Sequence, residues 1–239
     1  MTLFSQAEDA RLFSYRNRIF VIYNDNLEVV APLYTDRRDL FIAELIWIDD
    51  HYELSVPLKL YYKEKYHNQL WQKNWTPFEY QGKLLLSYSL NPHLILYPNL
   101  MTGECYQFCE TSLLLNWNFG PLRGSSQALL IDGEYFSFFH SGIVDFSHAS
   151  SYYYLWHYFM GAYTFSAKPP FQLTSMTPHP ILTEGLYTQS SREKRVIFPG
   201  GFAVVGPSLY LAYGKDDCEI WIMIIDKDAL KKTMKQLKE

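Results

Sequence analysis

The stretch QALLIDGEYFSFFHSG, residues 127–142, is the clearest fold signal in this sequence. An Asp-Gly pair at 132–133 separates two apolar runs, and glycine accepts the positive φ that a tight hairpin turn requires. The run after the turn is rich in aromatic residues, which favour the half-buried surface of a sheet. The stretch therefore predicts a β-hairpin whose second strand ends at Phe139.

Three further segments share this design of an apolar run, a turn and a second run that ends in an aromatic residue. They are ARLFSYRNRIFVIYND (10–25), TPFEYQGKLLLSYSLN (76–91) and GFAVVGPSLYLAYGKD (201–216), with turns at Asn17, Gly82 and Gly206 and closing residues Tyr23, Tyr88 and Tyr213. The four turns are separated by 65, 51 and 73 residues, a spacing that suits a four-stranded unit with loop insertions.

Further strand-like runs lie between the hairpins, at 40–49, 93–98, 158–165 and 219–226. A hairpin followed by outer strands, repeated in this way, predicts the blades of a β-propeller. We expect an all-β protein with about four blades evident in residues 1–239, which form a single propeller domain. A two-sheet sandwich is the alternative. Only the segment 226–239 is expected to be helical, with Asp226 or Asp228 as its N-cap.

The composition narrows the classes of function. Tyr, Phe and Trp make up 18% of the chain, the net charge is −4, and no basic stretch supplies a footprint for nucleic acid. The cysteines Cys105, Cys109 and Cys218 lack the spacing of a zinc site, so no metal is expected. No apolar run reaches the length of a membrane span and no signal peptide is evident, which predicts a soluble, cytoplasmic protein.

Polar clusters flank each hairpin and carry the functional signal. Before the hairpins come 8–11, 73–75 and 123–125, and after them come 24–25, 89–93, 140–141 and 215–217. The ends of the inner strands of a propeller converge, so these groups are expected to meet in one axial pocket. The alternative for any one cluster is a solvated loop or a strand-end cap.

The clusters, taken in order, resemble the motifs of the β-mannoside phosphorylase family, which has a five-bladed glycosidase-type propeller. Glu8-Asp9-Ala10-Arg11 looks like its Glu-Asp-Pro-Arg motif, and Lys73-Asn74-Trp75-Thr76-Pro77-Phe78 is similar to its basic-Asn-x-x-Phe segment. The remaining matches are Arg123-Gly124 with Phe139-His140-Ser141, Tyr158-Phe159-Met160-Gly161-Ala162, Phe198-Pro199-Gly200-Gly201 and Tyr213-Gly214-Lys215-Asp216-Asp217.

The resemblance implies that Asp9 is the general acid. In that family the acid passes its proton to the glycosidic oxygen through a sugar hydroxyl, while inorganic phosphate attacks the anomeric carbon from the other face. The alternative for Asp9 is an ion pair with Arg11, two residues further along the same strand. Glu8, its neighbour, is expected on the opposite face of the strand.

The other site residues are implied in the same way. Lys73 and Asn74 are expected to bind phosphate, with His140 as a second donor, and Asp217 is expected to accept a hydrogen bond from a sugar hydroxyl. The remaining expected binding residues are Arg11, Arg123 and Tyr158. The alternatives are a solvated loop charge for Lys73 and a strand-end histidine bonded to the backbone for His140.

The sequence departs from the family pattern at three places. Ala10 replaces a proline, and the second arginine of a His-Arg-Pro segment is absent, because the matching stretch reads Leu90-Asn91-Pro92-His93. His93 or Lys215 is the substitute that the sequence offers. Only seven residues precede Glu8, where the family has about one blade more, so we expect that blade to be missing. Partner strands or a homo-oligomer would then cover the open edge.

The resulting expectation is an enzyme that cleaves or forms β-mannosidic bonds by inverting phosphorolysis of mannosides. Its partner is an oligosaccharide or mannosyl substrate, and inorganic phosphate is the co-substrate, with no other cofactor. The alternatives are a hydrolase, a mannosyltransferase, and a degenerate propeller that binds carbohydrate without catalysis.

Overall fold

The computed structural model describes residues 6–30, 35–66, 68–145, 155–183, 185–187 and 194–237. In this part of the chain the regular secondary structure consists of strands, apart from the short helices α1 (Lys63–Tyr66) and α2 (Lys227–Thr233). The chain divides into two compact units. Unit 1 comprises Met1–Tyr88 and Leu94–Cys109, and unit 2 comprises Ser89–His93 and Glu110–Glu239. The prediction of a single domain over 1–239 stays a prediction.

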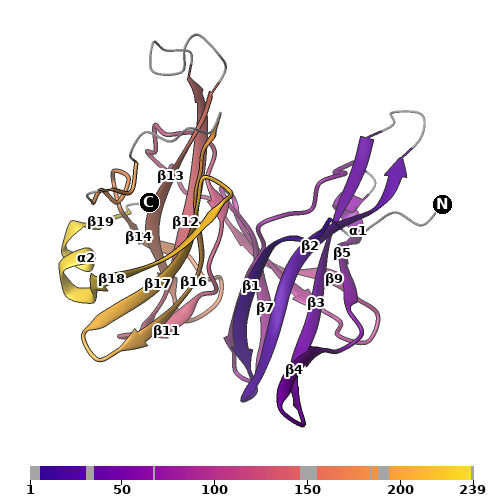
Figure 1. Ribbon diagram of the computed structural model, residues 1–239. Coiled ribbons are helices and arrows are strands. Elements are labelled where there is room, and N and C mark those ends of the chain that lie inside the picture. The colour runs from indigo at the N-terminus through magenta and orange to yellow at the C-terminus, as the bar shows by residue number, and fades with distance from the viewer. Residues whose placement is uncertain are drawn as a thin grey trace. The chain divides into compact units, whose positions relative to one another are not determined.

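Unit 1 is organised around a sheet with the strand order β1-β2-β3-β5-β9-β8-β7-β6, with β4 paired to β3 (Figure 1). The strands are β1 (Glu8–Tyr15), β2 (Arg18–Val30), β3 (Thr35–Ile48), β4 (His51–Leu54), β5 (Leu58–Tyr62), β6 (Thr76–Tyr80), β7 (Lys83–Leu90), β8 (His93–Pro98) and β9 (Glu104–Thr111). The meanders β1–β3 and β6–β9 contain the first two expected hairpins, and the parallel pair β5–β9 joins them.

Unit 2 contains two sheets. The first has the order β10-β12-β13-β14-β19, with β11 on β12 and β15 on β13, and the second has the order β16-β17-β18. The strands are β10 (Arg123–Gly124), β11 (Leu129–Ile131), β12 (Glu134–Asp145), β13 (Leu155–Ser166), β14 (Leu173–Met176), β15 (Lys194–Arg195), β16 (Ile197–Val205), β17 (Ser208–Lys215), β18 (Glu219–Asp226) and β19 (Lys235–Gln236). The remaining two hairpins, β11–β12 and β16–β17, are therefore confirmed.

The hairpin turns have the backbone that their residues favour. Arg16 and Asn17 both adopt positive φ, at 50° and 58°, and Asp132 and Gly133 do the same at 52° and 86°. Two successive left-handed residues make the type of turn whose twist matches that of the flanking strands. Each turn therefore sets which side chains of its two strands face the core.

A buried apolar cluster lies in each unit. In unit 1 the alternating residues Phe13 and Tyr15 of β1 point inward, beside Trp75 and Leu86. In unit 2 the cluster comes from both sheets and from α2; its buried members include Phe136, Phe138, Met160, Phe202, Leu211 and Leu230. Alternation of inward and outward side chains along each strand produces these cores from the sequence pattern.

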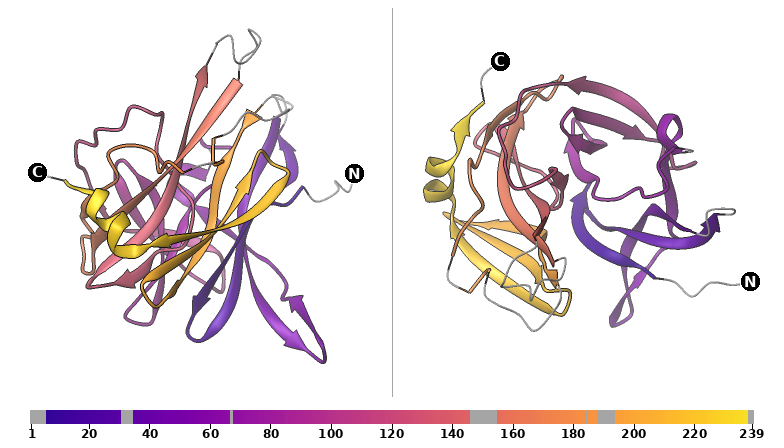
Figure 2. Two further views of the ribbon diagram at one scale, coloured as in Figure 1. Left: turned by 60° about the vertical axis from the view of Figure 1, so that its left-hand side comes forward. Right: turned by 90° about the horizontal axis from the view of Figure 1, so that it is seen from above.

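The C-terminal helix is shorter than expected. Asp226 is the N-cap and accepts a hydrogen bond from the Ala229 backbone N–H at 2.7 Å, as predicted. The helix ends at Thr233, because Met234 is extended and Lys235–Gln236 pairs with β14 as strand β19. Figure 2 shows α2 directly after β18 in both views. The prediction of a helix over 226–239 was therefore too long, since strand pairing satisfies the backbone beyond Met234.

Neither described helix is long and apolar enough to cross a membrane. All three cysteines are free, and burial raises the pKa of the Cys105 thiol to about 12. Among the described residues, no three His, Cys, Asp or Glu side chains gather closely enough to share a metal ion.

Gly161 is required by the packing of β12 against β13. A Cβ at this position would lie 2.3 Å from the Phe139 ring and 2.8 Å from Thr177 Oγ1. We expect Gly161→Ala to lower the free energy of unfolding by about 1–3 kcal/mol, because a packed ring has to move. Urea unfolding measures this. Gly200→Ala is the matched control, since its Cβ would meet only Ala212 O at 3.7 Å; an equal effect of both changes would contradict the explanation.

His93 makes the stability of the fold depend on pH. Its Nδ1 donates to Phe171 O at 2.8 Å, and burial lowers the pKa of His93 to about 4. An unfolded histidine has a pKa near 6.5, so between about pH 6.5 and 4 the unfolded chain binds more protons. The stabilisation is present above pH 6.5 and is lost as the pH falls toward 4.

The expected loss is on the order of 3 kcal/mol, measured as the free energy of unfolding in urea at a series of pH values. His93→Asn, which keeps a donor for Phe171 O, should flatten this dependence. The exposed His51 is the control position, and His51→Asn should leave the loss between pH 6.5 and 4 in place. A steep loss in His93→Asn would show that another group is responsible.

Candidate functional site

Asp9 lies on a β-bulge rather than on a regular strand. The pairing of β1 with β2 shifts register between Glu8 and Arg11, and Asp9 has a φ of 55°. Bulges redirect side chains, and here Asn24 Nδ2 lies 3.4 Å from Glu8 Oε1 and 3.3 Å from Asp9 Oδ2. The expectation that Glu8 and Asp9 lie on opposite faces was wrong, because the bulge brings both carboxylates to one amide.

Arg11 is buried beneath this bulge, with 1% of its surface exposed. Its guanidinium donates to Trp75 O at 3.0 Å and to the backbone oxygen of Asp9 at 3.3 Å. Burial lowers the pKa of Arg11 to about 10, against the charge of Asp9, which acts in the opposite direction. Arg11 therefore connects the bulge of β1 to the segment that precedes β6.

Lys73 lies at the same carboxylate. Lys73 Nζ and Arg38 Nη1 both pair with Glu8 Oε1. The Trp71 ring lies close to both cations, with its centroid 5.6 Å from Lys73 Nζ and 5.9 Å from Arg38 Cζ. Arg38 was missed by the sequence reasoning, since it belongs to none of the motifs and reaches the site through the pairing of β3 with the 70–72 segment.

Asn74 follows Lys73 with a φ of 65°. Its Oδ1 is buried without a hydrogen-bond partner in the part of the chain that the structure describes, as is Oδ1 of Asn24. Buried polar atoms are normally satisfied, so two such oxygens, one on Asn24 beside the carboxylates and one on the residue after Lys73, indicate a place where a ligand would bind. Unit 1 thus brings Asp9, Arg11 and Lys73 together and places Asn74 beside them in the chain.

Unit 2 brings together three other expected site residues. Arg123 and His140 are partners in the register of β10 and β12. His140 Nδ1 lies 2.6 Å from Ser125 Oγ, and its ring stacks on Tyr158 at 5.9 Å between centroids. The ring of Phe198 meets His140 edge-on at 5.1 Å, so the imidazole is held by contacts on several sides.

Asp217 is the fourth expected site residue of unit 2. It is exposed in the turn between β17 and β18, with a φ of 54°. The preceding Asp216 is the buried member of the pair and accepts a hydrogen bond from the Val196 backbone N–H at 3.0 Å. The sequence reasoning missed this structural role of Asp216, although its place before a turn is typical of an aspartate that caps backbone N–H groups.

His93 and Lys215, the expected substitutes for the absent arginine, have other contacts. His93 is buried and donates to Phe171 O, and Lys215 Nζ donates to Gly185 O at 2.7 Å. The expected residues divide evenly, with Asp9, Arg11, Lys73 and Asn74 in unit 1 and Arg123, His140, Tyr158 and Asp217 in unit 2. Their convergence on one axial pocket stays a prediction.

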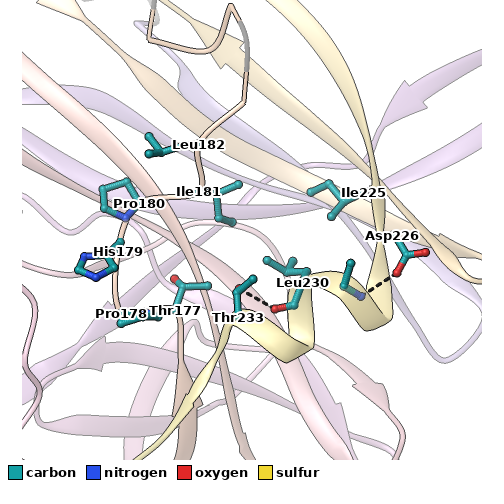
Figure 3. Close-up of a pocket in the computed structure, with 11 residues that line it drawn as sticks. Thr177, Pro178, His179, Pro180, Ile181, Leu182, Ile225, Asp226, Leu230 and Thr233 are labelled. Atoms are coloured by element: carbon teal, nitrogen blue, oxygen red, sulfur yellow. Dashed lines mark hydrogen bonds between the residues drawn. The ribbon is translucent and has the colours of Figure 1, made fainter.

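A cavity of about 450 Å³ lies in unit 2, between the segment 177–182, the end of β18 and α2 (Figure 3). Ile181, Leu182, Ile225 and Leu230 make its walls largely apolar. Two of its polar side chains serve the helix, since Asp226 caps α2 and Thr233 Oγ1 donates to Leu230 O at 2.7 Å. None of the expected site residues lines this cavity, so the candidate site lies elsewhere.

No protein-family model matches this sequence. No curated protein matches it either. Solved structures do match: a β-1,2-mannobiose phosphorylase from Listeria innocua has a TM-score of 0.62 at 17% identity, with 95% of this chain and 60% of that one covered. A glycosyl hydrolase from Bacteroides ovatus has a TM-score of 0.54 at 11% identity over 95% and 86% of the two chains.

A mannose phosphorylase from Leishmania mexicana, solved with a phosphate ion, has a TM-score of 0.52 at 12% identity, covering 98% of this chain and 71% of that one. The chain spans 60% of the length of the Listeria phosphorylase. At these identities the similarity shows the fold. The expected all-β, glycosidase-type propeller fold is thereby confirmed.

The bulge at Asp9 is expected to depend on the two hydrogen bonds that the Arg11 guanidinium donates to Asp9 O and Trp75 O. Arg11→Lys keeps the charge but cannot reach Trp75 O and Asp9 O together, so we expect the free energy of unfolding to fall by about 1–3 kcal/mol. Thermal and urea unfolding measure the change. Arg18→Lys, on an exposed arginine of the same unit, is the control and should have little effect. An equal free energy of unfolding in Arg11→Lys and Arg18→Lys would show that the two hydrogen bonds of the Arg11 guanidinium are dispensable.

Proposed function

We propose that this protein is a carbohydrate-active enzyme that cleaves or forms β-mannosidic bonds, by inverting phosphorolysis with Asp9 as the general acid. One observation carries the proposal. The bulge at Asp9 places a half-buried carboxyl beside Asn24 and within the cluster of Glu8 and Lys73. An acid next to cations is the pairing that phosphorolysis requires, since one group protonates the leaving oxygen while the others bind phosphate.

The proposed reaction is a single displacement. Asp9 gives its proton to a sugar hydroxyl, which passes its own proton to the glycosidic oxygen as the bond from that oxygen to the anomeric carbon breaks. An oxygen of phosphate forms the new bond to the anomeric carbon from the opposite face. A β-mannoside therefore yields α-mannose 1-phosphate and the shortened sugar, and Asp9 is reprotonated for the next cycle.

The remaining residues bind the two substrates. Lys73 and Asn74 are assigned to phosphate, and Arg11 holds the backbone of Asp9 in place. In unit 2, Arg123, His140, Tyr158 and Asp217 are assigned to sugar or phosphate contacts, with the stacked pair of His140 and Tyr158 forming the rigid part of that group. The proposal is supported by the shared fold of the Listeria and Leishmania phosphorylases.

The test is phosphate release from α-mannose 1-phosphate in the presence of mannose or short β-mannosides as acceptors. We expect turnover by the unaltered protein and a loss of roughly 10²- to 10⁴-fold in Asp9→Asn. Asparagine tolerates the left-handed backbone at position 9, so this variant should keep its fold. The matched control is Asp49→Asn, which makes the same change at an exposed turn residue with the same φ of 55°.

Incubation of β-mannosides without phosphate tests the hydrolase alternative, in which water is the nucleophile. Incubation with a nucleotide-linked mannose as the donor tests the mannosyltransferase alternative. Measurable binding of mannosides without turnover of any of them would overturn the enzymatic proposal and support a carbohydrate-binding protein. Full activity in Asp9→Asn would remove Asp9 from the role of acid.

A further inference from the structure

Two cations and one amide converge on a single oxygen of unit 1. Glu8 Oε1 pairs with Arg38 Nη1 and with Lys73 Nζ, and Asn24 Nδ2 lies 3.4 Å from the same atom. Two cations and an amide around one anionic oxygen form the kind of donor set that binds an oxygen of phosphate or a carboxylate. Here the protein's own carboxylate occupies that position.

The fold holds the donors in place. The Arg38 backbone N–H donates to Leu70 O at 2.8 Å and Arg38 O accepts from the Gln72 N–H at 2.7 Å, which fixes Arg38 beside the segment that leads to Lys73. The Trp71 ring lies within 6 Å of both cationic groups, and such contacts favour a cation at the ring face. Asn24 is fully buried on β2.

The carboxylate is the least confined member of the group. The side chain of Glu8 is 38% exposed, whereas those of Arg38 and Lys73 are 16% and 23% exposed. Glu8 lies at the edge of the bulge, where rotation of its side chain would place the carboxylate in water. Its departure would leave two cations around an empty position, and an anion from solution would restore the balance of charge.

We propose that Arg38, Lys73 and Asn24 bind one oxygen of an anionic substrate, and that Glu8 is the internal counter-ion which this anion displaces. The identity of the anion as inorganic phosphate rests on the proposed function. Arg38 then supplies the second cation that the stretch 90–93 lacks, from a different strand. Glu8 then competes with phosphate for the two cations, so its carboxylate lowers the affinity for phosphate.

The test is the binding of inorganic phosphate, measured by isothermal titration calorimetry without turnover. We expect Arg38→Gln and Lys73→Gln each to weaken binding by roughly 10- to 100-fold, because each would remove a charge-assisted hydrogen bond to phosphate. Glu8→Gln should tighten binding by roughly tenfold, because the competing negative charge is removed while the amide can still accept a hydrogen bond. Tighter phosphate binding in Glu8→Gln together with weaker binding in Arg38→Gln would indicate that phosphate displaces the Glu8 carboxylate.

Arg18→Gln is the matched control. It removes another arginine–glutamate pair of unit 1, that of Arg18 with Glu44, and should leave phosphate binding unchanged. Thermal unfolding of every variant shows whether the fold is kept, and Arg38→Lys, which keeps the charge, should restore part of the affinity. Binding of mannose should be unchanged in Arg38→Gln.

Weaker binding in both Glu8→Gln and Arg38→Gln would overturn the proposal, since the ion pair would then be structural. Unchanged binding in Arg38→Gln, or no phosphate binding by either the unaltered protein or Glu8→Gln, would overturn it too. Phosphate binding with the expected signs but no turnover of mannosides would disprove phosphorolysis and leave the anion site standing. Turnover of mannosides with a KM for phosphate that is unchanged in Arg38→Gln would disprove the anion site and leave phosphorolysis standing.

Discussion

The buried guanidinium of Arg11 is the interaction on which the candidate site of unit 1 depends. It joins the backbone of Asp9 to that of Trp75, and so holds the bulge of β1 against the chain that leads into β6. A fully buried charge is costly unless hydrogen bonds compensate for the lost water, and here Nε and Nη1 donate to backbone oxygens. Movement of the Asp9 backbone would therefore leave the buried guanidinium without one of its hydrogen bonds.

Charge neutralisation is the second constraint. Glu8 Oε1 pairs with both Arg38 and Lys73, so the cations that would attract an anion already share one carboxylate in the free protein. Such an arrangement keeps the cluster stable without a ligand and makes binding an exchange of one anion for another. The competing carboxylate would also favour anions that carry more charge than a carboxylate does.

In unit 2 the side chain of His140 is held by aromatic rings. His140 is hydrogen-bonded to Ser125 and enclosed by Tyr158 and Phe198. Aromatic packing of this kind restricts the imidazole to one orientation. The same packing explains Gly161, whose missing side chain makes room for Phe139 on the neighbouring strand.

The sequence by itself determined the hairpins, because Asp-Gly and similar turns and the alternation of apolar residues act over a few residues. It also identified Asp9, Lys73 and His140 as candidates through local motifs. Only the tertiary structure decided that Asp9 stands on a bulge, that β19 ends the C-terminal helix early, and that Arg38 meets Glu8 and Lys73. These depend on pairings between distant segments, whose register no local pattern encodes.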